Sequence, residues 1–255
     1  MDPIAILSGF GVGAIVGMTG VGGGSLMTPL LLTVFRLNPA VAIGTDLWFA
    51  AITKVSGAVA HQRHGHVDGR ITLLLLAGSL PASIATLALM HFTGITKGWA
   101  SALTFSLGIA LLLTAVTVAF RGVWHGVGLR LERWIPASRK PFFTVASGVL
   151  LGVLVTLSSI GAGAVGATLI LLLYPRLDAR RLVGTDIAHA VPLTLVAGIG
   201  HATMGHVNWG LLAALLVGSL PGIWIGAQLT KKMPDGLVRA LLCISLVTAG
   251  LKVIT

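Results

Sequence analysis

The chain has 255 residues, of which 55% are hydrophobic and only 9% are charged, and its mean hydropathy is +0.98. A soluble domain carries about 25% charged residues, because its surface must face water. The composition therefore excludes a soluble enzyme, a secreted disulfide scaffold and a disordered tail, and it predicts an all-α integral membrane protein. The single cysteine, Cys243, can form no intrachain disulfide.

The formal net charge of +10 comes from 17 Lys and Arg residues against 7 Asp and Glu residues. In a soluble protein this excess of positive charge would suggest nucleic-acid binding. Here the basic residues lie in short gaps between apolar segments and form no stripe with interleaved aromatic residues. Such gaps are where the positive-inside rule places them. The first apolar run follows Asp2 and Pro3 without a basic leader, so we expect a mature membrane segment there rather than a signal peptide.

Ten apolar segments follow one another in two sets of five. They are expected at 4–17, 22–35, 42–61, 71–92 and 99–120, and then at 142–159, 162–175, 182–200, 209–229 and 236–254. The last three of each set approach the roughly 20 residues that a helix needs to cross a bilayer. The first two of each set are shorter and are separated by a glycine-rich break. Each such pair is either a re-entrant hairpin or two short tilted spans.

The two sets are related by an internal repeat with an offset of 140 residues. Gly44-Thr45-Asp46 matches Gly184-Thr185-Asp186, and Gly65-His66-Val67 matches Gly205-His206-Val207. Gly78-Ser79-Leu80-Pro81 matches Gly218-Ser219-Leu220-Pro221 in the same register. The chain therefore divides into a first membrane repeat at 1–120, a basic cytoplasmic linker at 121–140 and a second membrane repeat at 141–255.

An odd number of crossings in each half predicts that the second repeat is inverted relative to the first. If the chain alternates sides, one side receives twelve loop Lys and Arg residues and the other receives three. This bias makes the richer side cytoplasmic, with both termini of the multi-pass protein outside. The matching loops 61–70 and 201–208 differ in charge, as inversion requires.

Inverted repeats with interrupted helices are typical of secondary transporters. Short helices that are interrupted at glycines leave unpaired backbone N–H groups and a partial positive charge at their N-termini. Such an end can bind an anion. The predicted substrate-binding residues therefore lie in the two breaks. They are Thr19, Gly22, Gly23, Gly24, Ser25, Ser158, Ser159, Gly161 and Gly163. The alternative is close helix packing by small residues, to which we assign Gly9, Gly13 and Gly17.

Ionisable residues inside predicted spans are few, and such residues usually serve function. Asp46 and Asp186 are expected to exchange protons, or else to cap their helices. Lys54, whose repeat partner is Thr194, is expected to contact an anionic substrate, the alternative being an internal ion pair with Asp46. His189, one turn after Asp186, is a candidate proton partner or a neutral hydrogen-bonded histidine.

A cluster of histidines resembles a metal-binding site and gives an alternative function, a transition-metal transporter of the Ni or Co type. It consists of His61, His64 and His66 with Asp68, although Met204 replaces the middle histidine in the repeat. An intramembrane enzyme would need a nucleophile–base pair or a metal triad within the spans, and no spaced set occurs, so we expect neither catalysis nor a cofactor. A passive channel is a further possibility, and a homo-oligomer stays open.

Several motifs resemble the sulfite exporter TauE/SafE family, also called TSUP, over nearly the whole chain. They are the glycine-rich stretch Gly17–Ser25 with Pro29, then Ala42–Asp46, Gly65–Asp68 and Gly78–Pro81. The resemblance implies a bacterial-type carrier of the cell inner membrane for small organosulfur compounds or sulfur oxyanions, such as sulfite, sulfoacetate or thiosulfate, with proton-coupled export. It also implies roles in the site for the 19–25 break, Thr45 and Asp46, and for their repeat mates, which include Thr185. Ser158–Gly163 departs from the family's fuller glycine run, so if both breaks line the site, its two halves differ in width and polarity.

Overall fold

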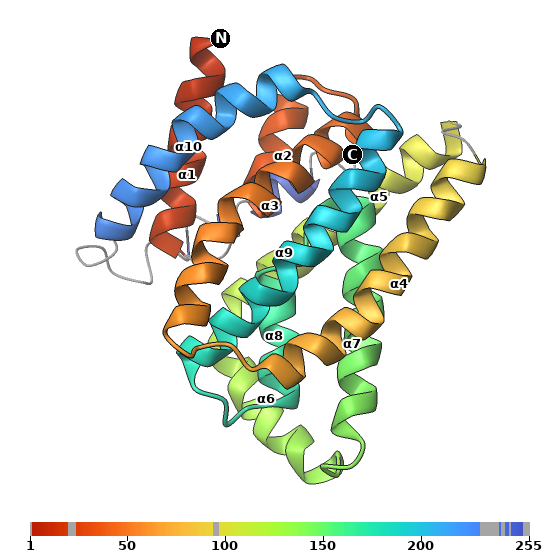
Figure 1. Ribbon diagram of the computed structural model, residues 1–255, viewed down its shortest axis with the longest axis vertical. Coiled ribbons are helices and arrows are strands. Elements are labelled where there is room, and N and C mark those ends of the chain that lie inside the picture. The colour runs from red at the N-terminus through yellow and green to blue at the C-terminus, as the bar shows by residue number, and fades with distance from the viewer. Residues whose placement is uncertain are drawn as a thin grey trace.

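The computed structural model describes residues 2–19, 24–93, 97–229, 240, 243–244 and 246–251. The described elements are helices, with no strand among them. They are α1 (Pro3–Thr19), α2 (Gly24–Thr33), α3 (Pro39–Arg63), α4 (Gly69–Thr93), α5 (Lys97–Ala119), α6 (Arg121–Trp134), α7 (Lys140–Ser158), α8 (Ala164–Leu173), α9 (Ala179–Thr203) and α10 (Trp209–Leu229) (Figure 1). Nine expected segments correspond to these helices, and most of the tenth, 236–254, lies outside the described residues.

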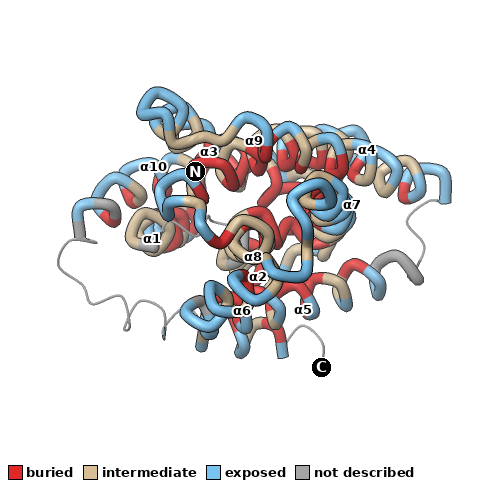
Figure 2. The backbone as a smooth tube through the Cα atoms, turned by 90° about the horizontal axis from the view of Figure 1, so that it is seen from below, coloured by how far each residue is buried: buried red, intermediate tan, exposed pale blue. Residues whose placement is uncertain are grey.

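The protein is a multi-pass membrane protein. Five described helices are long and apolar enough to cross a bilayer: Gly69–Thr93, Ser101–Ala119, Lys140–Ser158, Ala179–Thr203 and Trp209–Gly226. Their outward faces carry exposed apolar side chains, such as Leu73, Leu150 and Trp224, and the buried residues gather in the interior (Figure 2). By contrast, α2 and α8 have ten residues each, about 15 Å of helix against a hydrocarbon core of about 30 Å.

The region expected to be a linker contains a further helix, α6. It occupies 14 residues of the 121–140 stretch and lies at the lower end of the molecule (Figure 1). It packs against α8, where a Cβ on Gly128 would lie 2.8 Å from the Leu171 carbonyl oxygen. A polar sequence with little hydropathy signal therefore forms a helix because one side of it is docked on the bundle.

Two helix pairs hold the bundle together across the halves of the chain: α1 packs against α10, and α4 packs against α7. Both pairs approach closely at glycines. A Cβ on Gly13 would lie 2.4 Å from the Ser219 carbonyl oxygen, and a Cβ on Gly152 would lie 2.4 Å from that of Ser79. Gly9 makes the same kind of contact with Leu215, so the packing role expected of Gly9 and Gly13 is confirmed.

The third pair, α3 and α9, forms the centre of the molecule. Each helix begins with an N-cap from its own loop: the Asn38 side chain accepts a hydrogen bond from the Ala40 N–H, and Asp178 accepts one from the Arg180 N–H. Asp46 and Asp186 lie well inside these helices. The alternative that the two aspartates cap their helices is therefore wrong, because each cap is eight residues, about two turns, earlier in the chain.

Candidate functional site

The break between α7 and α8 is the part of the candidate site that the structure describes most fully. Helix α7 ends at Ser158, and Ser159 adopts a left-handed conformation with φ +59°. Gly161 and Gly163 follow with φ of +122° and +146°, values that favour glycine. The chain then enters α8, with the Gly166 N–H donating to the Gly161 carbonyl oxygen at 2.8 Å. The predicted interruption therefore exists, and Gly161 and Gly163 are needed because its backbone takes positive φ values at these two positions.

The two serines of this break have different surroundings. The Ser158 hydroxyl donates to the Leu154 carbonyl oxygen at 2.6 Å, and its oxygen accepts from the Ile160 N–H at 3.2 Å. Ser158 therefore closes its own turn. The Ser159 hydroxyl is buried without a hydrogen-bond partner of ordinary geometry, and it lies close enough to the Asp46 carboxylate to interact with it. Of the two, Ser159 is the one whose hydroxyl is not held within its own turn.

Lys54 lies at the centre of the bundle and reaches this break. Its side chain is 8% exposed, and its ammonium donates to the Ala162 carbonyl oxygen at 2.5 Å. Neither aspartate forms an ion pair with it in the described structure, so the alternative of a direct Lys54–Asp46 pair is not realised. Both carboxylates still act electrostatically on the ammonium, with Asp186 acting more strongly than Asp46.

The two repeat-related carboxylates meet different groups. Asp46 on α3 accepts a hydrogen bond from the Thr28 hydroxyl of α2. Asp186 on α9 instead lies against α8, where a Cβ on Gly166 would be 2.2 Å from its Oδ1 atom. The corresponding threonine of α8, Thr168, donates to its own helix at the Ala164 carbonyl oxygen. One oxygen of each carboxylate is buried without a hydrogen-bond partner.

His189 faces α4 rather than Asp186. Its Nε2 lies 2.9 Å from the Ser79 hydroxyl, while its Nδ1 is buried without a partner. The ring also lies within electrostatic range of the Lys54 ammonium. Lys54 is thus surrounded by Asp46, Asp186, His189 and the α7–α8 break. We call these residues, together with Ser159, the central cluster.

Thr45 and Thr185 link the two halves at the entrances to the central helices. The Thr45 hydroxyl oxygen accepts from the Asn208 N–H at 3.0 Å, and the Thr185 hydroxyl oxygen accepts from the Asp68 N–H at 3.0 Å. Their glycine neighbours make matching contacts. A Cβ on Gly44 would lie 2.0 Å from the His206 carbonyl oxygen, and one on Gly184 would lie 2.3 Å from that of His66.

The corresponding break between α1 and α2 is described only in part. Gly22 and Gly23 lie outside the described residues, as do the side chains of Thr19 and Ser25, while Gly24 begins α2. Their predicted roles in substrate binding stay predictions.

The histidine turns do not favour the metal alternative. The His61 and His66 ring centroids are 5.6 Å apart, and His64 stacks on His66 at 5.8 Å while its Nδ1 lies 2.7 Å from the Ala60 carbonyl oxygen. Asp68 instead accepts from the Ile71 N–H at the start of α4. Over the described residues, no three His, Cys, Asp or Glu side chains are arranged to hold a metal ion.

Besides Ala162, whose carbonyl oxygen accepts from Lys54, three residues of the site were missed in the sequence. Thr28, Gly166 and Ser79 each contact an ionisable residue of the central cluster. A signal existed for two of them, because Thr28 and Ser79 are retained in the repeat as Thr168 and Ser219. Gly166 belongs to Gly161-x-Gly163-x-x-Gly166, whose spacing matches a dinucleotide-binding motif. In this helical protein Gly166 instead leaves room for the Asp186 side chain against α8.

Three proteins similar to this chain are named as probable membrane transporters. The family model described as sulfite exporter TauE/SafE matches residues 5–253. Probable membrane transporter protein YjnA of Bacillus subtilis (strain 168) is 37% identical over 257 residues, covering all of both chains. Protein YdhB of the same strain, similarly named, is 29% identical over 97% of this chain and 98% of its own. Probable membrane transporter protein MJ0441 of Methanocaldococcus jannaschii is 24% identical over 98% of this chain and 94% of its own. No solved structure matches.

Proposed function

We propose, from the premise that this chain belongs to the sulfite exporter TauE/SafE family of membrane transporters, that it exports a small sulfur-containing anion. Sulfite, thiosulfate and sulfoacetate are the candidate substrates. The substrate binds at the central cluster between the glycine-broken hairpins, and its transport is coupled to protons.

The buried Lys54 ammonium is the observation that carries this proposal. A buried cation costs several kcal/mol unless it is paired or meets an anionic ligand. Among the described residues its one hydrogen bond is to a backbone carbonyl oxygen, in a break whose glycines allow the left-handed backbone. An oxyanion beside Lys54 gains a charge-assisted hydrogen bond from the ammonium and another from the Ser159 hydroxyl. Because Thr45, Thr185 and Ser158 hold structural hydrogen bonds, we place them at the margin of the substrate site.

The charge balance of the central cluster supports coupling to protons. One ammonium and two ionised carboxylates leave a net negative charge, which repels an anion in a low-dielectric interior. Protonation of Asp46 or Asp186 removes that repulsion, so the anion and the proton favour each other's binding. We therefore expect the apparent affinity for the substrate to increase as the pH falls.

The matched contacts of the two halves support an inverted repeat that works by alternating access. Residues 1–120 and 141–255 form the repeats, and the basic 121–140 linker with α6 lies on the cytoplasmic side. Each half presents its Gly-Thr-Asp sequence to the turn of the other half. Rocking of one half against the other then exposes the central cluster to the two sides in turn, and both termini lie outside the inner membrane.

The experiment that tests this proposal compares Lys54→Gln with Arg63→Gln, an exposed cation on the same helix. Thermal shifts of the purified protein are measured with sulfite, thiosulfate, sulfoacetate, chloride and Ni²⁺, and flux is measured in proteoliposomes. A native-state ligand raises the melting temperature in proportion to its occupancy. We expect stabilisation by one sulfur anion at the lower pH, lost in Lys54→Gln and kept in Arg63→Gln. Unchanged affinity in Lys54→Gln removes Lys54 from the site, and stabilisation by Ni²⁺ alone overturns the substrate class.

A further inference from the structure

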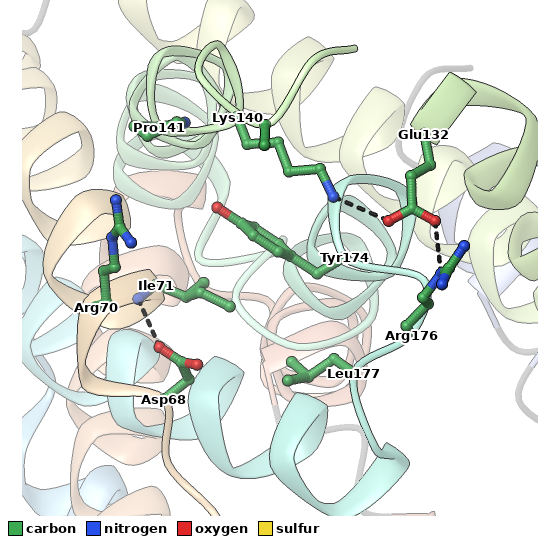
Figure 3. A pocket seen from close by; sticks show the side chains of 10 residues that line it. Asp68, Arg70, Ile71, Glu132, Lys140, Pro141, Tyr174, Arg176 and Leu177 are labelled. Carbon is green, nitrogen blue, oxygen red and sulfur yellow. Dashed lines mark hydrogen bonds and ion pairs between the residues drawn. The ribbon is translucent and has the colours of Figure 1, made fainter. Parts of the chain in front are cut away.

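A pocket of about 390 Å³ lies away from the central cluster, at the lower end of the bundle. Its walls come from the starts of α4 and α7, the end of α6 and the loop between α8 and α9. Figure 3 shows its polar lining, which consists of Asp68, Arg70, Glu132, Lys140, Tyr174 and Arg176. None of these six residues is used by the transport site proposed above.

The carboxylates of this pocket are already occupied. Glu132 accepts from the Lys140 ammonium at 3.1 Å and from the Arg176 guanidinium at 3.0 Å. Asp68 accepts from the Ile71 N–H and so caps α4. Arg70 has no ion pair or side-chain hydrogen bond within the described ranges, and Figure 3 shows its guanidinium on the wall opposite Glu132. The pocket therefore has one cation more than it has anions, and that cation is unpaired.

The surroundings of the pocket are both basic and apolar. Arg130, Arg133 and Arg139 are exposed on α6 and on the turn after it. Two large apolar side chains beside the same turn are also exposed, Trp134 to 86% and Phe142 to 71%. A helix with basic residues and exposed aromatic side chains, lying at the end of a membrane bundle, is typical of the membrane interface.

Three polar residues of this pocket are not retained in the sequence repeat. At the repeat offset of 140 residues, Asn208 replaces Asp68, Gly210 replaces Arg70 and Val34 replaces Tyr174. A gate used by both halves in turn needs equivalent groups at both ends, whereas a site for one leaflet does not. The asymmetry therefore favours a role that belongs to one face of the membrane.

We propose that this pocket binds the phosphate of an anionic phospholipid headgroup from the adjacent leaflet. Arg70 and Lys140 contact the phosphate oxygens from opposite walls, and the acyl chains lie over the exposed Phe142 and Trp134. Basic pockets at helix ends on the cytoplasmic side bind lipid headgroups in this way. Glu132 competes with the phosphate for Lys140 and Arg176, so it weakens binding. Free phosphate shares the recognised group, but it gains nothing from the aromatic side chains.

The test measures the binding of dioctanoyl phosphatidylglycerol to the purified full-length protein by thermal shift. Dioctanoyl phosphatidylcholine and inorganic phosphate are the comparison ligands. We expect a concentration-dependent rise in melting temperature with phosphatidylglycerol alone. Arg70→Gln should weaken binding about fivefold, whereas Arg63→Gln, which does not line the pocket, should leave it unchanged. Glu132→Gln should tighten it, which a merely structural role for Glu132 does not predict.

The other outcomes each overturn the proposal. Equal stabilisation by the two lipids means that the headgroup charge is not recognised. Equal stabilisation by inorganic phosphate, lost in Arg70→Gln, makes the ligand a free phosphate rather than a lipid. Because Arg70 has no partner to lose, Arg70→Gln should fold normally, and a melting temperature equal to that of the parent without ligand checks this.

Discussion

Thr28 makes the two repeat-related aspartates chemically different. Its hydroxyl donates to Asp46 within the bundle, whereas the hydroxyl of Thr168, its repeat mate, is turned to its own helix and leaves Asp186 without that donor. Asp186 instead lies against Gly166, where there is no room for a side chain. The sequence repeat thus retains both carboxylates while the groups that contact them differ, so we expect Asp46 and Asp186 to have separate tasks in transport.

This difference predicts unequal effects of the same substitution. Thr28→Val removes a buried hydrogen bond to a carboxylate and should lower the free energy of unfolding by about 1.5–3 kcal/mol. Thr168→Val removes only a bond to its own helix and should cost less than about 1 kcal/mol. Denaturation of the two variants in the same detergent measures both values. Equal losses would contradict the assignment of Thr28 to Asp46.

At the scale of single residues, the sequence predicts which ionisable groups are buried but not how each hydroxyl is used. Lys54 and the two aspartates could be identified because charge is rare inside apolar spans. Ser158 and Ser159 could not be told apart, because their roles depend on the left-handed turn at Ser159. Ala162 could not be found at all, since it contributes only its backbone carbonyl oxygen.

At the scale of elements, hydropathy locates the apolar helices to within a few residues, because the bilayer sets their length. It does not predict α6, which is polar and is held by contacts to α8 and by the ion pairs of Glu132, the only glutamate in the chain. The Lys140 ammonium first, and the Arg176 guanidinium with it, keep the pKa of Glu132 below its usual value of 4.5. Glu132 therefore attaches the end of α6 to α7 and to the loop before α9.

The lowered pKa predicts a pH-dependent contribution of Glu132 to stability. A carboxylate whose pKa is lower in the folded state stabilises the fold above its unfolded pKa and loses that contribution as the pH falls through its folded pKa. Glu132→Gln should therefore melt below the parent protein near pH 7, and the difference should shrink below about pH 4.5. Arg176→Gln, which removes one of the two partners, should give a smaller difference. If the difference in melting temperature between the parent and Glu132→Gln stays constant with pH, the ion pairs are excluded as its cause.

At the scale of the whole molecule, the two halves exchange their contacts instead of folding side by side. The first helix of each half packs on the fourth segment of the other, α1 on α10 and α7 on α4. The turn after α3 lies at the lower end of the molecule, and the repeat-related turn after α9 lies at the upper end (Figure 1). The sequence repeat predicts two similar halves, but it cannot predict this exchange, because the glycine contacts join segments far apart in the chain.

The proposed inversion predicts that repeat-related exposed positions label from opposite sides of the membrane. Arg63→Cys and Thr203→Cys, each in a Cys243→Ala background, place one thiol at the end of α3 or α9. An impermeant maleimide applied to intact cells should label only Thr203→Cys, and it should label Arg63→Cys after the cytoplasmic side is opened. The adjacent Gly65 and Gly205 are unsuitable, because their φ values of +67° and +76° favour glycine. Labelling of both variants from one side would contradict the inversion.

The pairing of α1 with α10 has a consequence for how the protein is made. Translation proceeds at about 5–20 residues per second, and α10 begins only at Trp209. On that scale α1 therefore waits about 10–40 s in the bilayer before the helix that covers Gly9 and Gly13 is synthesised. During that time its small-residue face is open to any other membrane helix. The nascent chain thus depends on the insertion machinery, or on the lipid around it, to keep α1 unpaired until its own partner arrives.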